Sequence, residues 1–214
     1  MSGWEVFDRY HARYDEWFSR NYVTAANELD AVREALRGAD GPCVEVGSGT
    51  GYFSSAMGCL GVEPSLGMAL EALRRGAQQV LGRAEALPIR SSSLGAVLMV
   101  VTLCFLERPE EAVAESSRVL RPGGRLVSCI ITRSSPWGRL YSELGASGHP
   151  FYSRARFYEV AEVDSMASAA GLTVAGRAAT LTYGPMERPR REQPRGYSGA
   201  ESFVCSVYVK PGRA

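Results

Sequence analysis

A glycine-rich loop at residues 44–51 constrains the fold of this 214-residue chain more than any other stretch. The loop reads Val-Glu-Val-Gly-Ser-Gly-Thr-Gly, which is typical of a buried strand that breaks into a glycine turn, with a helix opening at Tyr52. Glycines at such a turn let a ligand approach bare backbone at a helix N-terminus. The stretch therefore predicts an α/β sheet with a cofactor site at the end of its first strand.

The spacing of the glycines separates two classes of cofactor. A dinucleotide fingerprint, G-x-G-x-x-G, would place its third glycine where Tyr52 stands, whereas here that glycine comes one residue earlier. With Glu45 two residues before the first glycine, the pattern becomes E-x-G-x-G-x-G. It resembles motif I of the class I S-adenosylmethionine (SAM) dependent methyltransferases. The resemblance implies cofactor contacts from Glu45, Gly47, Ser48, Gly49 and Gly51.

Composition narrows the domain count and the kind of partner. With 214 residues, of which 45% are hydrophobic and 22% charged, the chain suffices for one well-cored domain. A net charge of +1 gives no broad electrostatic footprint for nucleic acid or an anionic membrane. We therefore expect one methyltransferase domain over residues 1–214, acting on a small molecule and not on nucleic acid.

The cysteines and apolar runs bear on location. No C-x-x-C pair occurs, and most of the five cysteines lie in apolar, strand-like segments: Cys43, Cys59, Cys104, Cys129 and Cys205. An odd number of buried thiols favours structural roles in a reducing cytoplasm. No apolar run is long enough to span a membrane, and no signal sequence precedes the first helix. We expect a cytoplasmic protein without a membrane span, and no histidine–cysteine spacing predicts a metal site.

Further motifs extend the resemblance over residues 42–132. The second predicted strand, 59–63, ends in Glu63, whose carboxylate would lie beside the glycine loop and accept hydrogen bonds from two ribose hydroxyls. Ala-Glu-Ala-Leu-Pro at 84–88 resembles the family's adenine loop, and Leu-Arg-Pro-Gly-Gly at 120–124 is a family landmark; the usual Phe-Asp before the central strand is replaced by Leu94-Gly95. The further cofactor contacts expected are Pro64, Met68, Ala84, Glu85 and Thr102. As alternatives, Glu63 is a solvated strand-end charge and Met68 fills the core.

Alternating strand and helix patterns complete the predicted fold. Apolar runs predict further strands at 79–81, 94–106, after the Pro-Gly-Gly turn, at 172–183 and at 203–209. Helices are expected over 4–22, 24–38, 52–58, 65–76, 109–120 and 154–170. Together with the resemblance, this order implies a Rossmann-like, doubly wound, seven-stranded sheet with an antiparallel last strand and helices on both faces.

Aromatic residues outside the sheet predict an acceptor pocket. Phe7, Tyr10, Tyr14, Trp17 and Phe18 share one face of a helix, which either caps the cofactor or packs on the core. Residues 1–38 are thus an expected helical cap, and 133–214 an expected lid and C-terminal hairpin. Aromatic islands at 135–141 and 151–153 would overhang the same crevice. The expected acceptor contacts are Tyr14, Trp17, Phe105, Trp137 and Tyr152.

Two histidines, His11 in the cap and His149 in the lid, are candidates for a general base. The alternative for each is a solvated side chain without a catalytic role. The sequence predicts a SAM-dependent methyltransferase for a small, partly apolar acceptor, in a branch that resembles the ubiquinone and menaquinone methyltransferases. The main alternative is a non-catalytic protein of the same fold that binds SAM or S-adenosylhomocysteine (SAH). A nicotinamide-dependent oxidoreductase is a third interpretation. Neither the acceptor nor the oligomeric state follows from the sequence.

Overall fold

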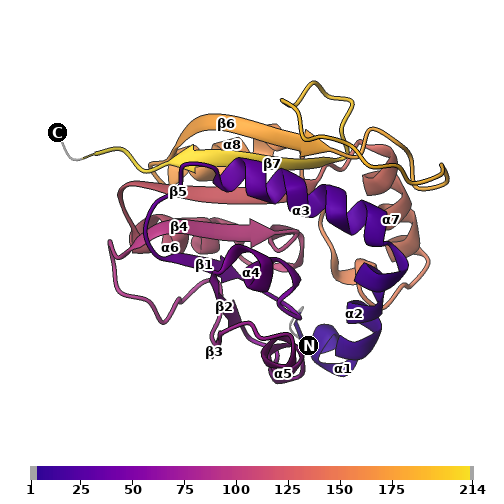
Figure 1. Cartoon of the computed structure of the whole chain (residues 1–214), viewed down its shortest axis with the longest axis horizontal. Coiled ribbons are helices and arrows are strands. Elements are labelled where there is room, and N and C mark those ends of the chain that lie inside the picture. Colours follow the sequence, from indigo (N-terminus) through magenta and orange to yellow (C-terminus); the bar gives the residue numbers. More distant parts are fainter. Residues whose placement is uncertain (1–3, 213–214) are drawn as a thin grey trace.

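Seven strands form one sheet in the order β3-β2-β1-β4-β5-β7-β6 in the computed structural model, which describes residues 4–212 (Figure 1). The strands are β1 Cys43–Val46, β2 Leu60–Glu63, β3 Gln79–Leu81, β4 Leu94–Val100, β5 Leu120–Ile131, β6 Thr173–Thr180 and β7 Phe203–Val209. β7, the last strand in the chain, pairs antiparallel with both of its neighbours, β5 and β6, and all other strand pairs are parallel. The predicted doubly wound sheet with an antiparallel last strand is confirmed.

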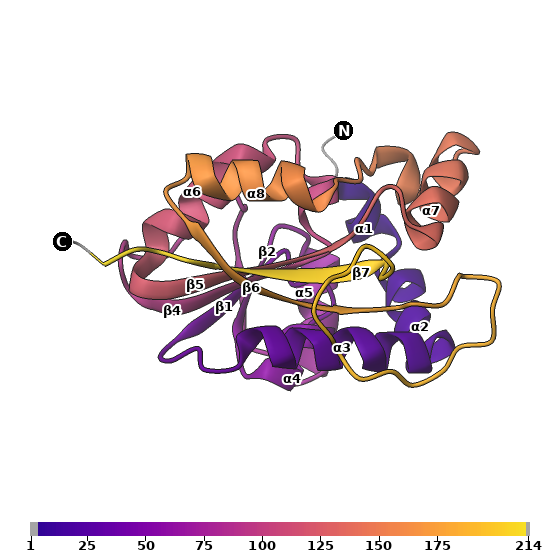
Figure 2. The same cartoon turned by 90° about the horizontal axis from the view of Figure 1, so that it is seen from above.

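Helices cover both faces of this sheet. They are α1 Glu5–Arg9, α2 His11–Arg20, α3 Tyr22–Leu36, α4 Tyr52–Met57, α5 Leu66–Arg74, α6 Pro109–Val119, α7 Pro136–Ala146 and α8 Val160–Ala169. Figure 2 shows α6 and α8 on one face and α3 and α4 on the other. Each face has its own apolar core, and apolar side chains of β4 contribute to both because all of its residues are buried.

The central strand ends earlier than predicted and at a site-forming turn. Instead of continuing to 106, β4 stops at Val100, because Val101 has a positive φ of 52° that no extended strand can accommodate. A short 3-10 turn, Leu103–Phe105, follows. Helices α1, α2 and α7 gather at the end of the sheet to which this turn belongs (Figures 1 and 2). Non-glycine residues with positive φ are often found at functional sites.

Gly95, which stands where the family commonly has Asp, lies in a sterically tight place. A Cβ atom at residue 95 would lie 1.5 Å from the carbonyl oxygen of Asp40, because the turn before β1 crosses the start of β4 there. The Gly95 N–H donates to Pro42 O at 2.9 Å. Only glycine fits between these two chain segments, and the departure lies far from the glycine loop in the sequence.

The N-terminal segment differs from the single helix predicted over 4–22. It forms two helices, α1 and α2, which meet at Tyr10 with φ −119° and ψ 27°. The expected cap of residues 1–38 is also too long, because α3 packs on the sheet with Ala25, Ala31 and Val32 fully buried. The cap that the structure describes is therefore α1 and α2, and α3 belongs to the core.

The expected lid contains a helix that the sequence interpretation missed. Ser135 accepts a hydrogen bond from the Gly138 N–H at 3.0 Å, and Pro136 occupies the first turn, so both common N-terminal signals start α7. The helix predicted over 154–170 begins only at α8, where Glu159 and Glu162 form a capping box. Both errors arose because capping signals that are present in the sequence were overlooked.

The prediction of unpaired thiols is wrong for four of the five cysteines. Cys43 and Cys59 form a disulfide next to the paired strands β1 and β2, and Cys129 and Cys205 form one between directly opposed residues of β5 and β7. Cys104 is a free, buried cysteine. The cytoplasmic location, which rested partly on free thiols, stays a prediction. Among residues 4–212, no helix has the length and apolar character of a membrane span.

Thiol titration of the unfolded protein tests this pairing. Without a reductant we expect one reactive thiol, on Cys104, and after reduction we expect all five cysteines to react. Mass spectrometry of a non-reduced digest should show the two linked peptide pairs. Five reactive thiols before reduction would contradict the structure.

Candidate functional site

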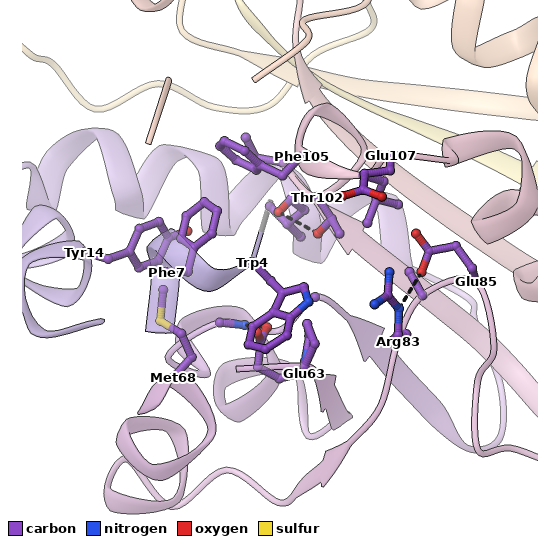
Figure 3. Close-up of a pocket in the computed structure, with 17 residues that line it drawn as sticks. Trp4, Phe7, Tyr14, Glu63, Met68, Arg83, Glu85, Thr102, Phe105 and Glu107 are labelled. Carbon is purple, nitrogen blue, oxygen red and sulfur yellow. Dashed lines mark hydrogen bonds and ion pairs between the residues drawn. The ribbon is translucent and has the colours of Figure 1, made fainter. Parts of the chain in front are cut away.

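A cavity lies where β1, β2 and β4 end, beneath the N-terminal helices (Figure 3). Its empty space, counted out to the open mouth, is about 770 Å³. Eight residues predicted to bind the cofactor line it: Gly47, Gly49, Glu63, Pro64, Met68, Ala84, Glu85 and Thr102. We call this space the cofactor cavity; the binding roles of its residues stay predictions.

The glycine loop is shaped by steric constraints. Gly47 has a φ of 67°, and a Cβ atom there would lie 2.4 Å from Thr102 Cγ2, so no other residue fits without a shift. The Thr102 hydroxyl donates to Val46 O at 3.0 Å, which fixes the end of β4 to the end of β1. A Cβ atom at Gly51 would lie 2.8 Å from Ala72 Cβ on α5. Gly51 therefore serves helix packing and does not line the cofactor cavity.

Glu63 joins the loop to the end of β2. Its Oε2 accepts a hydrogen bond from the Gly49 N–H at 2.9 Å, and its Oε1 accepts one from the Ser65 N–H at 3.0 Å. Burial raises the pKa of Glu63, although these two bonds oppose the shift. Each oxygen keeps a further lone pair, so the carboxylate can also accept from two neighbouring hydroxyls of a ligand.

Glu45 and Ser48, also predicted to bind the cofactor, do not line the cavity. Glu45 is 1% exposed and lies near Ser54 of α4, and its Oε2 has no hydrogen-bond partner in the described part of the chain. Burial raises the pKa of Glu45 to about 8. The Ser48 hydroxyl donates to Gln79 Oε1 at 2.8 Å. Both side chains support the glycine loop from behind.

Glu45→Gln should change how stability depends on pH. In the folded protein the Glu45 carboxyl has a pKa of about 8, whereas in the unfolded chain it ionises near pH 4.5. Ionisation therefore favours the unfolded chain between these two values, and the free energy of unfolding falls as pH rises from about 4.5 to 8. At about 1.4 kcal/mol per pKa unit, the free energy of unfolding of the variant relative to wild type should be on the order of a few kcal/mol more favourable at pH 8.5 than at pH 4.5. Urea denaturation at pH 4.5 and 8.5 measures this difference. An equal effect of the substitution at both pH values would contradict it.

The sequence interpretation missed several residues of the cofactor cavity, among them Trp4 and Arg83. Trp4 lies in the centre of the labelled lining residues in Figure 3, and its buried Nε1 has no hydrogen-bond partner within residues 4–212. Arg83 Nε lies 3.6 Å from Glu85 Oε2. The aromatic pattern of the first helix begins at Trp4, which was the available signal. Arg83 precedes the predicted adenine loop and carried no signal of its own.

A second cavity adjoins the first and has aromatic walls. We call it the acceptor cavity after the contacts predicted around it; that an acceptor binds there stays a prediction. Its empty space, including the open mouth, is about 1,130 Å³. Five residues line both cavities: Phe7, Tyr14, Val100, Val101 and Phe105. The other aromatic residues along its walls are Trp17, Phe18, Phe53, Tyr141, Phe151, Tyr152 and Phe157, joined by His149. Four predicted acceptor contacts, Tyr14, Trp17, Phe105 and Tyr152, thus lie together around this space.

Trp137 lies elsewhere. It lines neither cavity, and its indole N–H donates to Tyr183 O at 2.8 Å inside the core of α7 and the sheet. The prediction that Trp137 contacts the acceptor is therefore wrong. The residue was expected in an open lid, but it lies on the buried face of α7, a helix that was not predicted.

The two histidines also separate. His11 lines neither cavity, and its Nδ1 lies 3.2 Å from Glu71 Oε1 on α5. His149 lines the acceptor cavity, where its ring stacks on Tyr152 with centroids 4.6 Å apart. Burial, with a smaller effect of Arg13, lowers the pKa of His149. A neutral imidazole can accept a proton at neutral pH, so only His149 remains a candidate base.

Polar contacts fix the cap to the rest of the site. Asp8 Oδ1 accepts from the Ser65 hydroxyl at 2.7 Å and from the Gly67 N–H at 2.8 Å, at the N-terminus of α5. The Gly67 bond, more than any other interaction, lowers the pKa of Asp8. Arg75 forms an ion pair with Asp15 of α2 and donates to a backbone oxygen of the glycine loop. The cap thus joins the elements that surround the cofactor cavity.

Comparisons with known proteins agree with this geometry. Residues 44–128 match a family described as a methyltransferase domain. An uncharacterized protein of Mycobacterium tuberculosis strain H37Rv is 37% identical over 177 residues, which are 81% of this chain and 62% of that protein. The chain thus spans less than two thirds of this relative's length. An uncharacterized protein of Methanocaldococcus jannaschii is 33% identical over 75% of this chain and 78% of its own length.

A solved structure carries the assignment to a family. A SAM-dependent methyltransferase of Thermotoga maritima superposes with a TM-score of 0.91 and 34% sequence identity, over 97% of this chain and 99% of that one. The glycine loop and Glu63 lie at the carboxyl ends of adjacent parallel strands, as the motif resemblance implied. The chain belongs to the class I SAM-dependent methyltransferases, whose cofactor is S-adenosylmethionine.

Proposed function

We propose that this protein transfers a methyl group to a small, partly apolar acceptor that binds in the acceptor cavity. The observation that carries the proposal is the junction of the two cavities at Tyr14, Val101 and Phe105. The glycine loop and the Glu63 carboxylate lie on one side of this junction, and a wall of aromatic rings lies on the other. Such an arrangement brings two ligands end to end, as an in-line displacement requires.

The residues of the cofactor cavity fit SAM. Glu63 would accept hydrogen bonds from the ribose hydroxyls, and the backbone of Gly47 and Gly49 would lie against the methionine part. The loop at Ala84-Glu85 would border the adenine, and the unpartnered Nε1 of Trp4 offers a further donor inside the cavity. When bound, SAM supplies a methyl group on a positively charged sulfur, which needs no activation by the protein.

The chain's own contribution is alignment and exclusion of water. Phe7 stacks on Phe151 with ring centroids 5.1 Å apart and packs edge-on against Phe105 at 4.7 Å, so cap and lid meet over the junction. Water that is excluded there cannot compete with the acceptor for the methyl group. His149 can take a proton from an acceptor that must lose one.

Acceptor turnover tests the proposal. The T. maritima protein is described as a possible histamine N-methyltransferase, so small amines should stand beside phenols, alcohols and thiols in the panel. We expect SAH release from SAM that depends on one class of acceptor and disappears in Glu63→Ala. SAM binding with no turnover across the panel would favour the alternative, a non-catalytic SAM-binding protein.

A further inference from the structure

One acidic side chain of the acceptor cavity has no role in the account so far. Glu28, on the buried face of α3, lines this cavity and is 6% exposed. Within residues 4–212, no hydrogen bond or ion pair reaches its carboxyl group at the distances that define one, and burial alone raises its pKa. Glu63, the buried acid at the end of β2, by contrast accepts hydrogen bonds from the backbone N–H groups of Gly49 and Ser65.

An unpartnered buried carboxyl is destabilising unless something else compensates it. Transfer of a polar group from water to an apolar site without a hydrogen bond is unfavourable, and transfer of an ionised group is more unfavourable still. Burial raises the pKa of Glu28 to about 8, so the carboxyl is neutral in the empty cavity at neutral pH. A ligand that brings a positive charge would stabilise the carboxylate and satisfy its oxygens.

The walls of the cavity favour the same ligand. Ring faces attract cations, and the aromatic residues around the acceptor cavity include Trp17, Tyr141 and Tyr152. Tyr141 and Tyr152 stack with their centroids 4.3 Å apart. Glu28 lines the same cavity as these two rings. The cavity therefore combines an acid with a partial aromatic cage.

The two arginines around the cavity oppose a bound cation only weakly. Arg13 and Arg20 also line it, but both are exposed, and Arg20 Nη2 lies 2.6 Å from Glu16 Oε2. Charges at an exposed position are screened by solvent and salt. His149 has a lowered pKa and carries no charge at neutral pH. Among the described residues that line the acceptor cavity, Glu28 is the only acid.

Resting on the proposed methyl transfer, we propose that the acceptor is a small amine whose protonated nitrogen binds between Glu28 and the aromatic walls. Neither the glycine loop nor the family assignment requires an acid at this place on α3. The proposal thus assigns a specificity-determining residue and a substrate class. It does not require that the nitrogen held by Glu28 be the one that receives the methyl group.

Calorimetry with matched probes tests the proposal. With the protein saturated by SAH, 2-phenylethylamine and tryptamine are compared with their neutral counterparts, 2-phenylethanol and tryptophol. We expect the wild-type protein to bind each amine about tenfold or more tightly than its alcohol, since a hydrogen bond to a charged group is worth at least that factor. Glu28→Gln should remove this preference by weakening the amines about tenfold while changing the alcohols by less than about threefold.

Glu16→Gln is the matched control. It makes the same substitution on the outer surface of α2, where Glu16 is exposed and pairs with Arg20, so it should leave both affinities unchanged. The amine–alcohol comparison in the wild-type protein remains decisive even if Glu28→Gln does not fold. Equal binding of amine and alcohol, or an amine preference that survives Glu28→Gln, would overturn this inference alone. Absence of SAH binding by the wild-type protein would overturn the proposed function and this inference with it.

Discussion

Glu63→Ala is expected to weaken SAM binding about a hundredfold or more. The substitution removes the proposed acceptor of two ribose hydroxyls, and each hydrogen bond to a charged group is worth about 1.5–3 kcal/mol. It also releases the Gly49 N–H, which the carboxylate holds at 2.9 Å, so the glycine loop loses a support at the same time. Isothermal titration calorimetry of both proteins with SAM measures the change.

Comparing the loss of SAM affinity in Glu85→Ala with that in Glu63→Ala tests where the adenine and the ribose bind. Its side chain borders the predicted adenine position, where backbone groups can replace part of the contact, so SAM affinity should fall less than in Glu63→Ala. Glu63→Gln retains one acceptor oxygen and should lie between the two. An unchanged dissociation constant in Glu63→Ala, or a larger loss in Glu85→Ala, would show that the ribose and adenine have been exchanged or misplaced.

Deleting residues 1–10 is expected to abolish most SAM binding and turnover while leaving a protein that still melts cooperatively. The deletion removes Trp4 and Phe7 from the cofactor cavity, together with the Asp8 contacts to α5. Helix α1 has no buried residue, whereas Phe18 of α2, which stacks on Tyr52 with centroids 4.1 Å apart, is retained. The core should therefore survive the loss of this part of the cap.

Asp8→Asn is the point-variant counterpart of this deletion. It removes the negative charge of the side chain that accepts two hydrogen bonds at the start of α5. SAM binding should be weakened less than by the deletion. Thermal melting followed by circular dichroism, with SAM titration of the same samples, separates folding from binding. An aggregated or non-cooperative chain after deletion would mean that α1 is part of the core, and Trp4 would lose its claim as a site residue.

The features that sequence predicted well are those with local causes. Strands β3 and β7 have the bounds expected from apolar runs between turn residues, and Glu63 lies beside the glycine loop because the carboxyl ends of adjacent parallel strands meet. The glycine spacing follows from the backbone that the turn requires, with positive φ at all three glycines of the loop. These features follow from a few consecutive residues and from the order of the strands.

The features that sequence missed depend on which segments meet in space. Glu28 is one acid on a helix predicted as part of the N-terminal cap, and nothing local shows that its side chain lines an aromatic cavity. The disulfide between Cys129 and Cys205 joins residues 76 positions apart, and the pairing follows only once β5 and β7 are known to be neighbours. Trp137 was misplaced for the converse reason, since the helix that buries it was not predicted.

Titration of the wild-type protein with SAM, SAH and NAD⁺ by calorimetry tests the central claim most directly. The claim is that the cavity formed by the glycine loop and Glu63 is a SAM site, although its sequence lies one residue from a dinucleotide fingerprint. The account predicts that SAM and SAH each bind at one site per chain and that NAD⁺ does not compete with them. Binding of NAD⁺ in place of SAM, or no binding of SAM and SAH, would contradict it.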